Sequence, residues 1–319
     1  MVKQSGIAAY LWMLAGCVSF TGMNTLVHGL RHTCDWEVIA LFRTGLAFLF
    51  ALLLVRAARA RLAILRPRSL WIRSLAGSVS LVCCFFAITR AGPVANVLAI
   101  TNIFPLWVAL LGWPMYGLRP TRSVLLLVVT AISGVLLIRL PQLQAGHGFL
   151  DPSDDTALAA VFALVASVAT AVAMLGLNRL AWIDTRAVVV HFSGVSMLFC
   201  CGALALLERH LPLENLLEPL AIAMLLGVGV TATAGQICLT KAFTLGAPAK
   251  VAVVGLTQIV LTLLVDVCVF DESFTSLNLL GILLVLVPTA WVLLQTRRRG
   301  VVARREMKHL DKKRELEQV

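Results

Sequence analysis

Ten apolar stretches, five in each half, follow one another along almost the whole chain. Each is roughly twenty residues long, the length that an α-helix needs to cross a bilayer. The bilayer core offers no water to backbone amides, so stretches of this kind are expected to be helical. We place the spans at residues 8–28, 36–55, 70–89, 93–116, 122–140, 157–178, 187–207, 219–243, 247–270 and 274–295.

Composition and charge narrow the class further. Hydrophobic residues make up 60% of the chain, against about 45–50% in soluble domains, so a water-soluble fold is excluded. The net charge of +11 lies mainly in two arginine groups, between spans 2 and 3 and after span 10, as the positive-inside rule predicts for cytoplasmic segments. We expect contact with anionic lipid and no nucleic-acid partner. The groups are Arg56, Arg59, Arg61, Arg66, Arg68 and Arg73, then Arg297, Arg298, Arg299, Arg304 and Arg305.

The cysteines do not suggest a redox or metal centre. Seven of the eight fall within predicted spans, and Cys34 falls in a predicted external loop. Buried cysteine behaves as a small hydrophobic residue, so neither a disulfide framework nor a cofactor is expected. The first span is too long for a signal-peptide core and is expected to be retained.

Loop charges indicate that the two halves are inverted copies. The loop after the second span is arginine-rich in the first half and acidic in the second, so equivalent loops lie on opposite sides. Gly92-Pro93-Val94-Ala95 opens span 4, and Gly246-Ala247-Pro248-Ala249 opens span 9, 154 positions later. Inverted duplicates are a recurrent plan of secondary transporters.

We therefore predict an all-α membrane protein whose ten transmembrane helices form two inverted five-helix repeats. The repeats span residues 1–145 and 146–296, and a basic cytoplasmic tail follows at 297–319. Both termini are expected in the cytoplasm, with the protein in a plasma membrane or a bacterial inner membrane.

Several segments resemble one known family. They are ALFRTGLAFLF with Arg43, FFAITRAGPVANVLAITNIFPLWVALL, GQICLTKAFTLGAPAKVAV, and Glu272 followed by Gly281. On these residues the chain is similar to the EamA-type members of the drug/metabolite transporter superfamily, over essentially its whole length. The resemblance implies a central cavity lined by spans 1, 3, 4, 6, 8 and 9, and export or exchange of small metabolites. The acid expected ahead of span 5 is replaced by Leu118-Arg119, so its role is not carried over.

Polar residues near the middle of the spans are the predicted substrate site, because such groups are costly in lipid unless they face a cavity or a partner. Pro105 cannot donate to the carbonyl of Thr101, so span 4 should kink there and free an acceptor. The alternative is hydrogen bonding between packed helices. The predicted substrate-binding residues are Asn24, Thr101, Asn102, Trp107, Gln236, Thr257 and Gln258.

Ionisable residues nearer the helix ends suggest charge recognition. Arg43, Arg90, Lys241 and Lys250 would favour a carboxylate or phosphate, although basic side chains at helix ends also snorkel to headgroups. His191 and Asp266 are candidates for proton coupling, or else structural hydrogen-bonding partners.

The predicted function is alternating-access transport of a small organic metabolite of amino-acid or organic-acid type, anionic or zwitterionic. Export is slightly favoured over uptake. The alternative is a flippase for a lipid-linked or amphiphilic substrate, which would need a lateral apolar opening below a basic headgroup site. An intramembrane enzyme would need paired carboxylates, a Ser/His pair or a metal cluster at one depth, and the sequence offers none. A homodimer is compatible with this interpretation.

Overall fold

The computed structural model describes residues 7–30, 36–90, 97, 100–117, 119–145, 154–206, 218–270, 275–292 and 294, and within these ranges it is entirely helical apart from short connections. Seven helices are long and apolar enough to cross a membrane, and three further apolar helices are shorter. The helices are α1 (Ala8–Leu30), α2 (Trp36–Ala57), α3 (Arg68–Arg90), α5 (Phe104–Tyr116), α6 (Arg122–Ala145), α7 (Asp154–Asn178), α8 (Thr185–Leu206), α10 (Pro219–Leu245), α11 (Pro248–Gly255), α12 (Thr257–Phe270) and Ser276–Val292.

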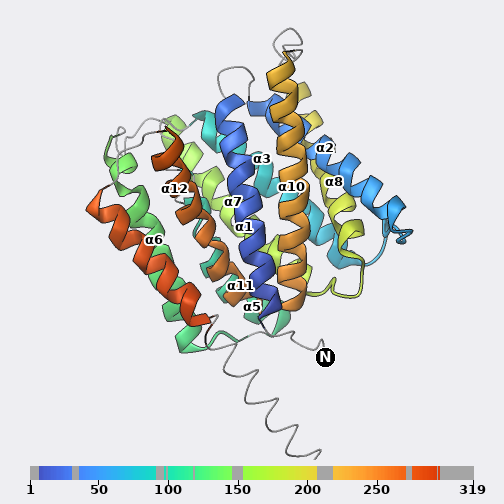
Figure 1. Cartoon of the computed structure of the whole chain (residues 1–319). Helices are drawn as coiled ribbons and strands as arrows, with labels where there is room; N and C mark the ends of the chain where they lie inside the picture. Colours follow the sequence, from blue (N-terminus) through green and yellow to red (C-terminus); the bar gives the residue numbers. More distant parts are fainter. Residues whose placement is uncertain are drawn as a thin grey trace, which may run out of the picture.

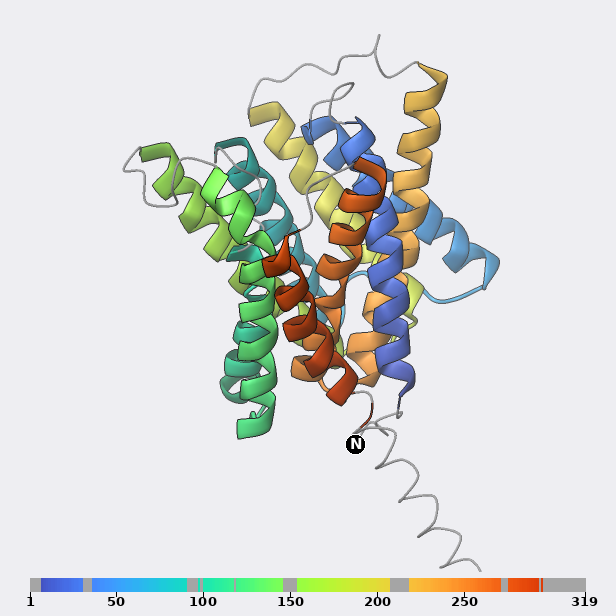
Figure 2. The same cartoon turned by 60° about the vertical axis from the view of Figure 1, so that its left-hand side comes forward.

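These helices confirm the predicted spans, with ends that differ by a few residues. α11 and α12 together form span 9, and Ser276–Val292 forms span 10. α1 rises from the end of the bundle where the N-terminus is marked in Figure 1, which we call the lower end. α7, the sixth span, enters from the upper end and runs the opposite way (yellow-green in Figure 2). The second half is therefore inverted relative to the first. The basic tail at 297–319 lies outside the described residues.

The packing partners repeat the same inversion. α1 packs along α10, and its counterpart α7 packs equally extensively along α3, the counterpart of α10. α3 also packs on α8, as α10 packs on α2. α2 with α8, and α5 with α11, pair across the pseudo-twofold axis. Each helix of the first repeat therefore packs on the second repeat in the same way as its counterpart in the second repeat packs on the first.

Close approach through small residues holds the paired helices together. A Cβ at Gly16 of α1 would lie 3.4 Å from Cβ of Cys238 and 3.6 Å from the carbonyl oxygen of Gly235, both on α10. Small residues at crossings allow backbones to approach, which is how helices gain van der Waals contact in a solvent that supplies little hydrophobic drive.

Two symmetry-related interfaces between the repeats differ in chemistry. The α3–α8 interface carries two side-chain hydrogen bonds, Ser74 Oγ with His191 Nδ1 at 2.7 Å and Ser78 Oγ with Ser196 Oγ at 2.9 Å. At the counterpart interface, Gly229 of α10 packs against the apolar side chains of Leu46 and Phe50 on α2. The architecture is symmetric, but the two interfaces are held by different forces.

Spans 4 and 9 are both interrupted, at corresponding positions. A turn at Asn102–Ile103 precedes α5, and a turn at Leu256 separates α11 from α12. In span 4 the amide of Ile103 donates to Ile100 and that of Leu106 donates to Ile103; in span 9 the amides of Leu256 and Ile259 donate to Val253 and Leu256 in the same pattern. Ile103 and Leu256 are 153 positions apart, within one residue of the spacing between Gly92 and Gly246.

The sequence predicts only one of these interruptions. Span 4 has the kink expected from Pro105, which lies in the first turn of the resumed helix, where a missing amide hydrogen costs little. An unbroken span 9 over residues 247–270 is wrong, because its helix breaks at Leu256 without a proline.

Replacing Gly134 by Ala tests the crossing of spans 5 and 10. A Cβ at Gly134 of α6 would lie 2.6 Å from the carbonyl oxygen of Gly281 and 2.8 Å from Cβ of Leu284. We expect Gly134→Ala to lower the free energy of unfolding by about 1–3 kcal/mol, as overpacking generally does. The measurement is thermal unfolding in detergent micelles.

Gly202→Ala in α8 is the matched control, because a Cβ there would meet no atom within 4 Å. It should be neutral or stabilise the protein by up to about 1 kcal/mol through helix propensity. Equal stability of the two variants would contradict the crossing.

Candidate functional site

The two helix breaks lie part-way along spans 4 and 9, and the helices that adjoin them, α5 and α11, contact each other. The carbonyl of Gly255 loses its ordinary helical donor, because the amide of Ile259 donates to Leu256 instead. The thiol of Cys17 on α1 lies 3.5 Å from that carbonyl oxygen and donates to it. Because freed carbonyls at membrane depth need a partner, the first repeat supplies one to the broken helix of the second.

The predicted residues of span 4 surround its break. Thr101 Oγ1 donates to the carbonyl of Val97 at 2.8 Å, so its hydroxyl is already used. Asn102 is part of the turn and half-buried. The indole Nε1 of Trp107 is buried and has no hydrogen-bond partner among the described residues. Trp107 therefore carries an unused donor, and Asn102 sits in the backbone interruption itself.

The predicted residues of spans 1, 8 and 9 divide between substrate binding and structural hydrogen bonding. Thr257 Oγ1 lies 3.3 Å from Thr289 Oγ1, a contact between helices of the kind expected for structural hydrogen bonding. The side chain of Gln258 is half-buried beside the break, and Asn24 is half-buried on α1. Gln236 is 9% exposed and accepts a hydrogen bond from an arginine of the other repeat.

The basic candidates occupy both ends of the bundle. Arg43 is half-buried on α2, and the thiol of Cys84 on α3 lies beside both Arg43 and Thr101. Near the lower end the Nζ of Lys241 stands 4.2 Å from the ring centroid of Trp12, a cation–π contact between α10 and α1. Lys250 is half-buried near the start of α11. The side chains of Arg90 and Asp266 lie outside the described residues.

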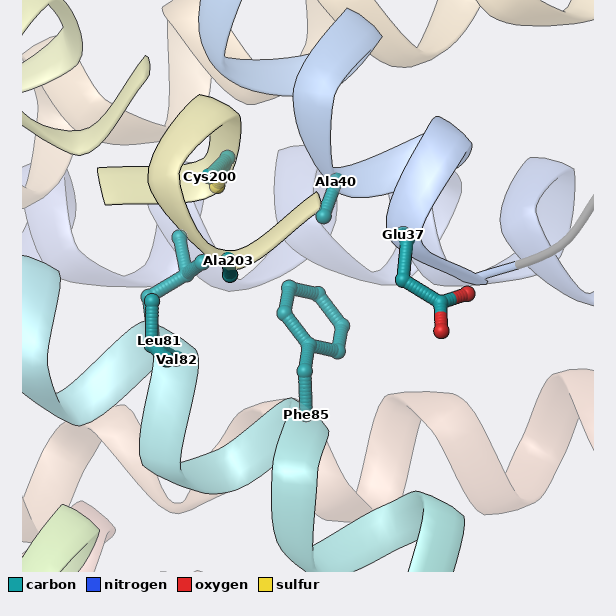
Figure 3. Close-up of a pocket in the computed structure, with 7 residues that line it drawn as sticks. All are labelled: Glu37, Ala40, Leu81, Val82, Phe85, Cys200 and Ala203. Atoms are coloured by element: carbon teal, nitrogen blue, oxygen red, sulfur yellow. The ribbon is translucent and has the colours of Figure 1, made fainter. Parts of the chain in front are cut away.

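A small pocket opens between α2, α3 and α8 towards the upper end (Figure 3). The ring of Phe85 points between the other two helices, towards Ala40, and the buried carboxylate of Glu37 stands beside it. The pocket measures about 10 Å³, room for about one water. A metabolite can enter here only if the helices move apart. Its lining residues are Glu37, Ala40, Leu81, Val82, Phe85, Cys200 and Ala203.

Arg73 is the feature that sequence reasoning missed. Its assignment to the loop arginines is wrong, because the side chain lies inside the bundle with 2% exposure. Nη2 donates to Oε1 of Gln236 on α10 at 3.2 Å, and Cζ lies 4.0 Å from the ring centroid of Phe192 on α8. A Cβ at Gly77 would collide with Nη1, so the glycine one turn further along α3 makes room for the guanidinium. The signal in the sequence is a glycine four residues, about one helical turn, after an arginine, because it leaves space for that arginine inside the bundle.

His191 precedes Phe192 on α8 and forms a hydrogen-bonded chain with Ser74 and the loop before α3. Nδ1 is 2.7 Å from Ser74 Oγ, and Nε2 is 3.1 Å from the carbonyl oxygen of Ile64 in the loop before α3. Since a carbonyl only accepts, Nε2 carries the proton in this arrangement, and the neutral ring accepts from Ser74. Trp71 meets the ring edge-on at 4.7 Å. These contacts support the structural alternative for His191, which ties the loop to α3 and α8.

The fold and its centre define a class of protein: a polytopic helical membrane protein of two inverted repeats, each with one broken helix at the bundle centre. The chain belongs to the EamA-like transporter family, whose sequence model matches it twice, at residues 7–140 and 157–294. The resemblance stated from the sequence is thereby confirmed. Membership makes this protein a multi-pass integral membrane transporter with a small-molecule substrate.

Two curated relatives are each called pseudopaline exporter CntI, from two strains of Pseudomonas aeruginosa. Each is 30% identical over 234 residues, which cover 73% of this chain and 78% of the relative. A solved crystal structure superposes with a TM-score of 0.79 and 16% sequence identity, covering 92% of this chain and 99% of that one. At that identity the likeness concerns the fold.

A double-mutant cycle tests the hydrogen bond between Ser74 and His191. Ser74→Ala and His191→Phe each remove one partner, and the phenyl ring keeps the edge contact with Trp71. We expect a coupling free energy of about 0.5–1.5 kcal/mol in thermal unfolding, the ordinary value of one such bond.

Pairing Ser74→Ala with the distant Thr289→Val is the control, and those two effects should add. Additive effects of Ser74→Ala and His191→Phe would contradict the assigned contact.

Proposed function

We propose that the protein exports a small organic metabolite of amino-acid or organic-acid type by alternating access, with no chemical step. The observation that carries the proposal is the pair of corresponding helix breaks, one in each repeat, whose adjoining helices α5 and α11 contact each other. Broken helices at the repeat interface are where secondary transporters bind substrates, because freed backbone groups there can be exchanged for ligand contacts. The relatives named as exporters favour outward movement.

The packing suggests how the two repeats move. The extensive α1–α10 and α3–α7 contacts join a helix of one repeat to a helix of the other, and they form two equivalent bodies. Rocking these bodies about the α5–α11 contact would widen one end and narrow the other. In this mechanism Asn102 and Gln258, at the two breaks, hold the substrate midway, and Trp107 offers its unused donor.

The flippase alternative has less support. An apolar groove does run between α3 and α7, lined by residues such as Leu75, Val79, Leu164 and Val168. Its described lining contains no basic or polar side chain that could hold a headgroup. An acyl chain of the surrounding lipid is the occupant that this chemistry fits.

Counterflow in proteoliposomes tests the proposal. Vesicles preloaded with a panel of amino acids, organic acids, nucleotides and vitamins should accumulate at least one labelled member, and Asn102→Ala should reduce the rate by about tenfold if it removes one substrate hydrogen bond. Ser19→Ala is the control with an unchanged rate, because among the described residues the hydroxyl of Ser19 donates to the carbonyl of Ala15 on its own helix and to no other group.

Scrambling of labelled lipid together with failure of every soluble candidate would replace the export proposal by the flippase. An Asn102→Ala protein that transports at the wild-type rate would remove Asn102 from the site.

We further propose that the lower end of the bundle faces the cytoplasm. The exposed Arg61 lies in the loop between α2 and α3, and the exposed Glu218 precedes α10. With Cys34, Cys201 and Cys268 replaced by Ala, an Arg61→Cys protein should react with an impermeant maleimide only after cell lysis, and a Glu218→Cys protein should react in intact cells. The reverse pattern would invert the orientation.

A further inference from the structure

Arg73 is a buried cation with unused donors. Its Nε and Nη1 atoms are buried and have no hydrogen-bond partner among the described residues. Within the described ranges, the one hydrogen bond of its guanidinium runs from Nη2 to the neutral amide oxygen of Gln236. An unpaired charge in a low-dielectric interior is costly, and each unsatisfied donor adds to that cost. In this state the arginine is poised for an anion that is not part of the protein.

The surroundings keep the guanidinium inside rather than letting it reach the headgroups. Gly77 leaves space along α3, and Phe192 covers one face of the plane. A Cβ at Gly176 of α7 would lie 3.4 Å from Cβ of Arg73, so that helix closes against the base of the side chain. An arginine five residues into a helix could otherwise snorkel. Residues from three other helices hold this one in the interior.

The free donors match a carboxylate. A guanidinium offers two in-plane forks, one from Nε and one Nη, the other from both Nη atoms, and both forks include Nη2. The oxygen of Gln236 can occupy only one of them, so the other remains open. A carboxylate fills such a fork with two parallel charge-assisted hydrogen bonds. The stacked Phe192 leaves the donor edge uncovered, because it lies over the face of the plane.

The position of Arg73 links it to the proposed transport site. The arginine belongs to the first repeat, and Gln236 and Phe192 belong to the second. Gly235, next to Gln236, packs on Phe20 and Gly16 of α1, and the adjoining Cys17 bonds to the break of span 9. A separation of α3 from α8 and α10 would break these two contacts of Arg73 and uncover the guanidinium.

We propose that Arg73 binds a carboxylate group of the transported metabolite, in a state in which Gln236 and Phe192 have moved away from α3. This inference rests on the proposed transport function, and it narrows the substrate class to carboxylates. The empty protein keeps the guanidinium stacked and bonded to Gln236, and the substrate replaces both contacts.

The test is the thermal midpoint of the purified full-length protein in the presence of small probes. Succinate, L-glutamate and citrate are the carboxylate probes, succinamide and L-glutamine provide partly or fully amidated counterparts, and sodium chloride and inorganic phosphate control for simple anions. We expect a carboxylate probe to raise the midpoint of the wild-type protein. Arg73→Gln should lower the affinity for that probe by about tenfold or more, the effect of losing a charged hydrogen-bond pair.

Two further variants isolate the role of the fork. Arg68→Gln removes an exposed arginine at the start of the same helix and should bind the probe as the wild type does. Arg73→Lys keeps the charge without the fork and should give an intermediate affinity. Equal binding by Arg73→Gln and wild type, a response confined to chloride or phosphate, or no response to any carboxylate would each overturn the proposal.

The transport assay separates this inference from the proposed function. Counterflow of a neutral or cationic metabolite that Arg73→Gln leaves unchanged would overturn the role of Arg73 and leave export standing. Arg73-dependent carboxylate binding without counterflow of any metabolite would overturn the export proposal and leave the role of Arg73 standing.

Discussion

Inside a bilayer every backbone amide and carbonyl must find its partner within the protein, and that requirement governs this structure. It makes the spans helical, and it makes each interruption of a helix an event that the neighbouring helices must compensate. Spans 4 and 9 are interrupted at corresponding points, and the carbonyl of Gly255 receives the thiol of Cys17 from α1 of the other repeat. Backbone groups held this way can be released again, because the compensating donor belongs to a separate helix. Rigid helices thus meet at a centre whose hydrogen bonds are exchangeable.

The inverted duplication explains why the helices pair as they do. α1 with α10 and α3 with α7 are the same contact made twice, as are α3 with α8 and α10 with α2. A structure built in this way has two conformations of related geometry, obtained by exchanging the roles of the two repeats. The upper-end pocket has room for about one water, so a metabolite can enter between α2, α3 and α8 only when these helices separate.

The sequence predicts those features of the fold and the site whose cause lies within a few residues, and it does not predict those that depend on contacts between distant helices. Span positions follow from length and apolarity, and the break in span 4 follows from Pro105, so both could be derived. The break at Leu256 has no proline, and the thiol that compensates for it comes from Cys17 on α1, a partner that sequence spacing does not reveal. Arg73 is the last of the arginines at 56–73, so its position in the sequence predicts a loop residue. Gly77 instead leaves the space that lets the side chain of Arg73 turn inward. The hydrogen bond between Arg73 and Gln236 joins residues 163 positions apart, and no periodicity within a helix predicts such a pair.

The unlike chemistry of the α3–α8 and α2–α10 interfaces has an energetic consequence. A carrier with identical halves would divide its time evenly between its two orientations, since each would cost the same. Here one interface carries the Ser74–His191 and Ser78–Ser196 bonds, and the other relies on Gly229 against Leu46 and Phe50. A net difference of about 1 kcal/mol, the typical worth of one hydrogen bond, shifts a two-state population roughly fivefold. The unloaded carrier is therefore expected to dwell in one orientation, so its cycle has a built-in starting point.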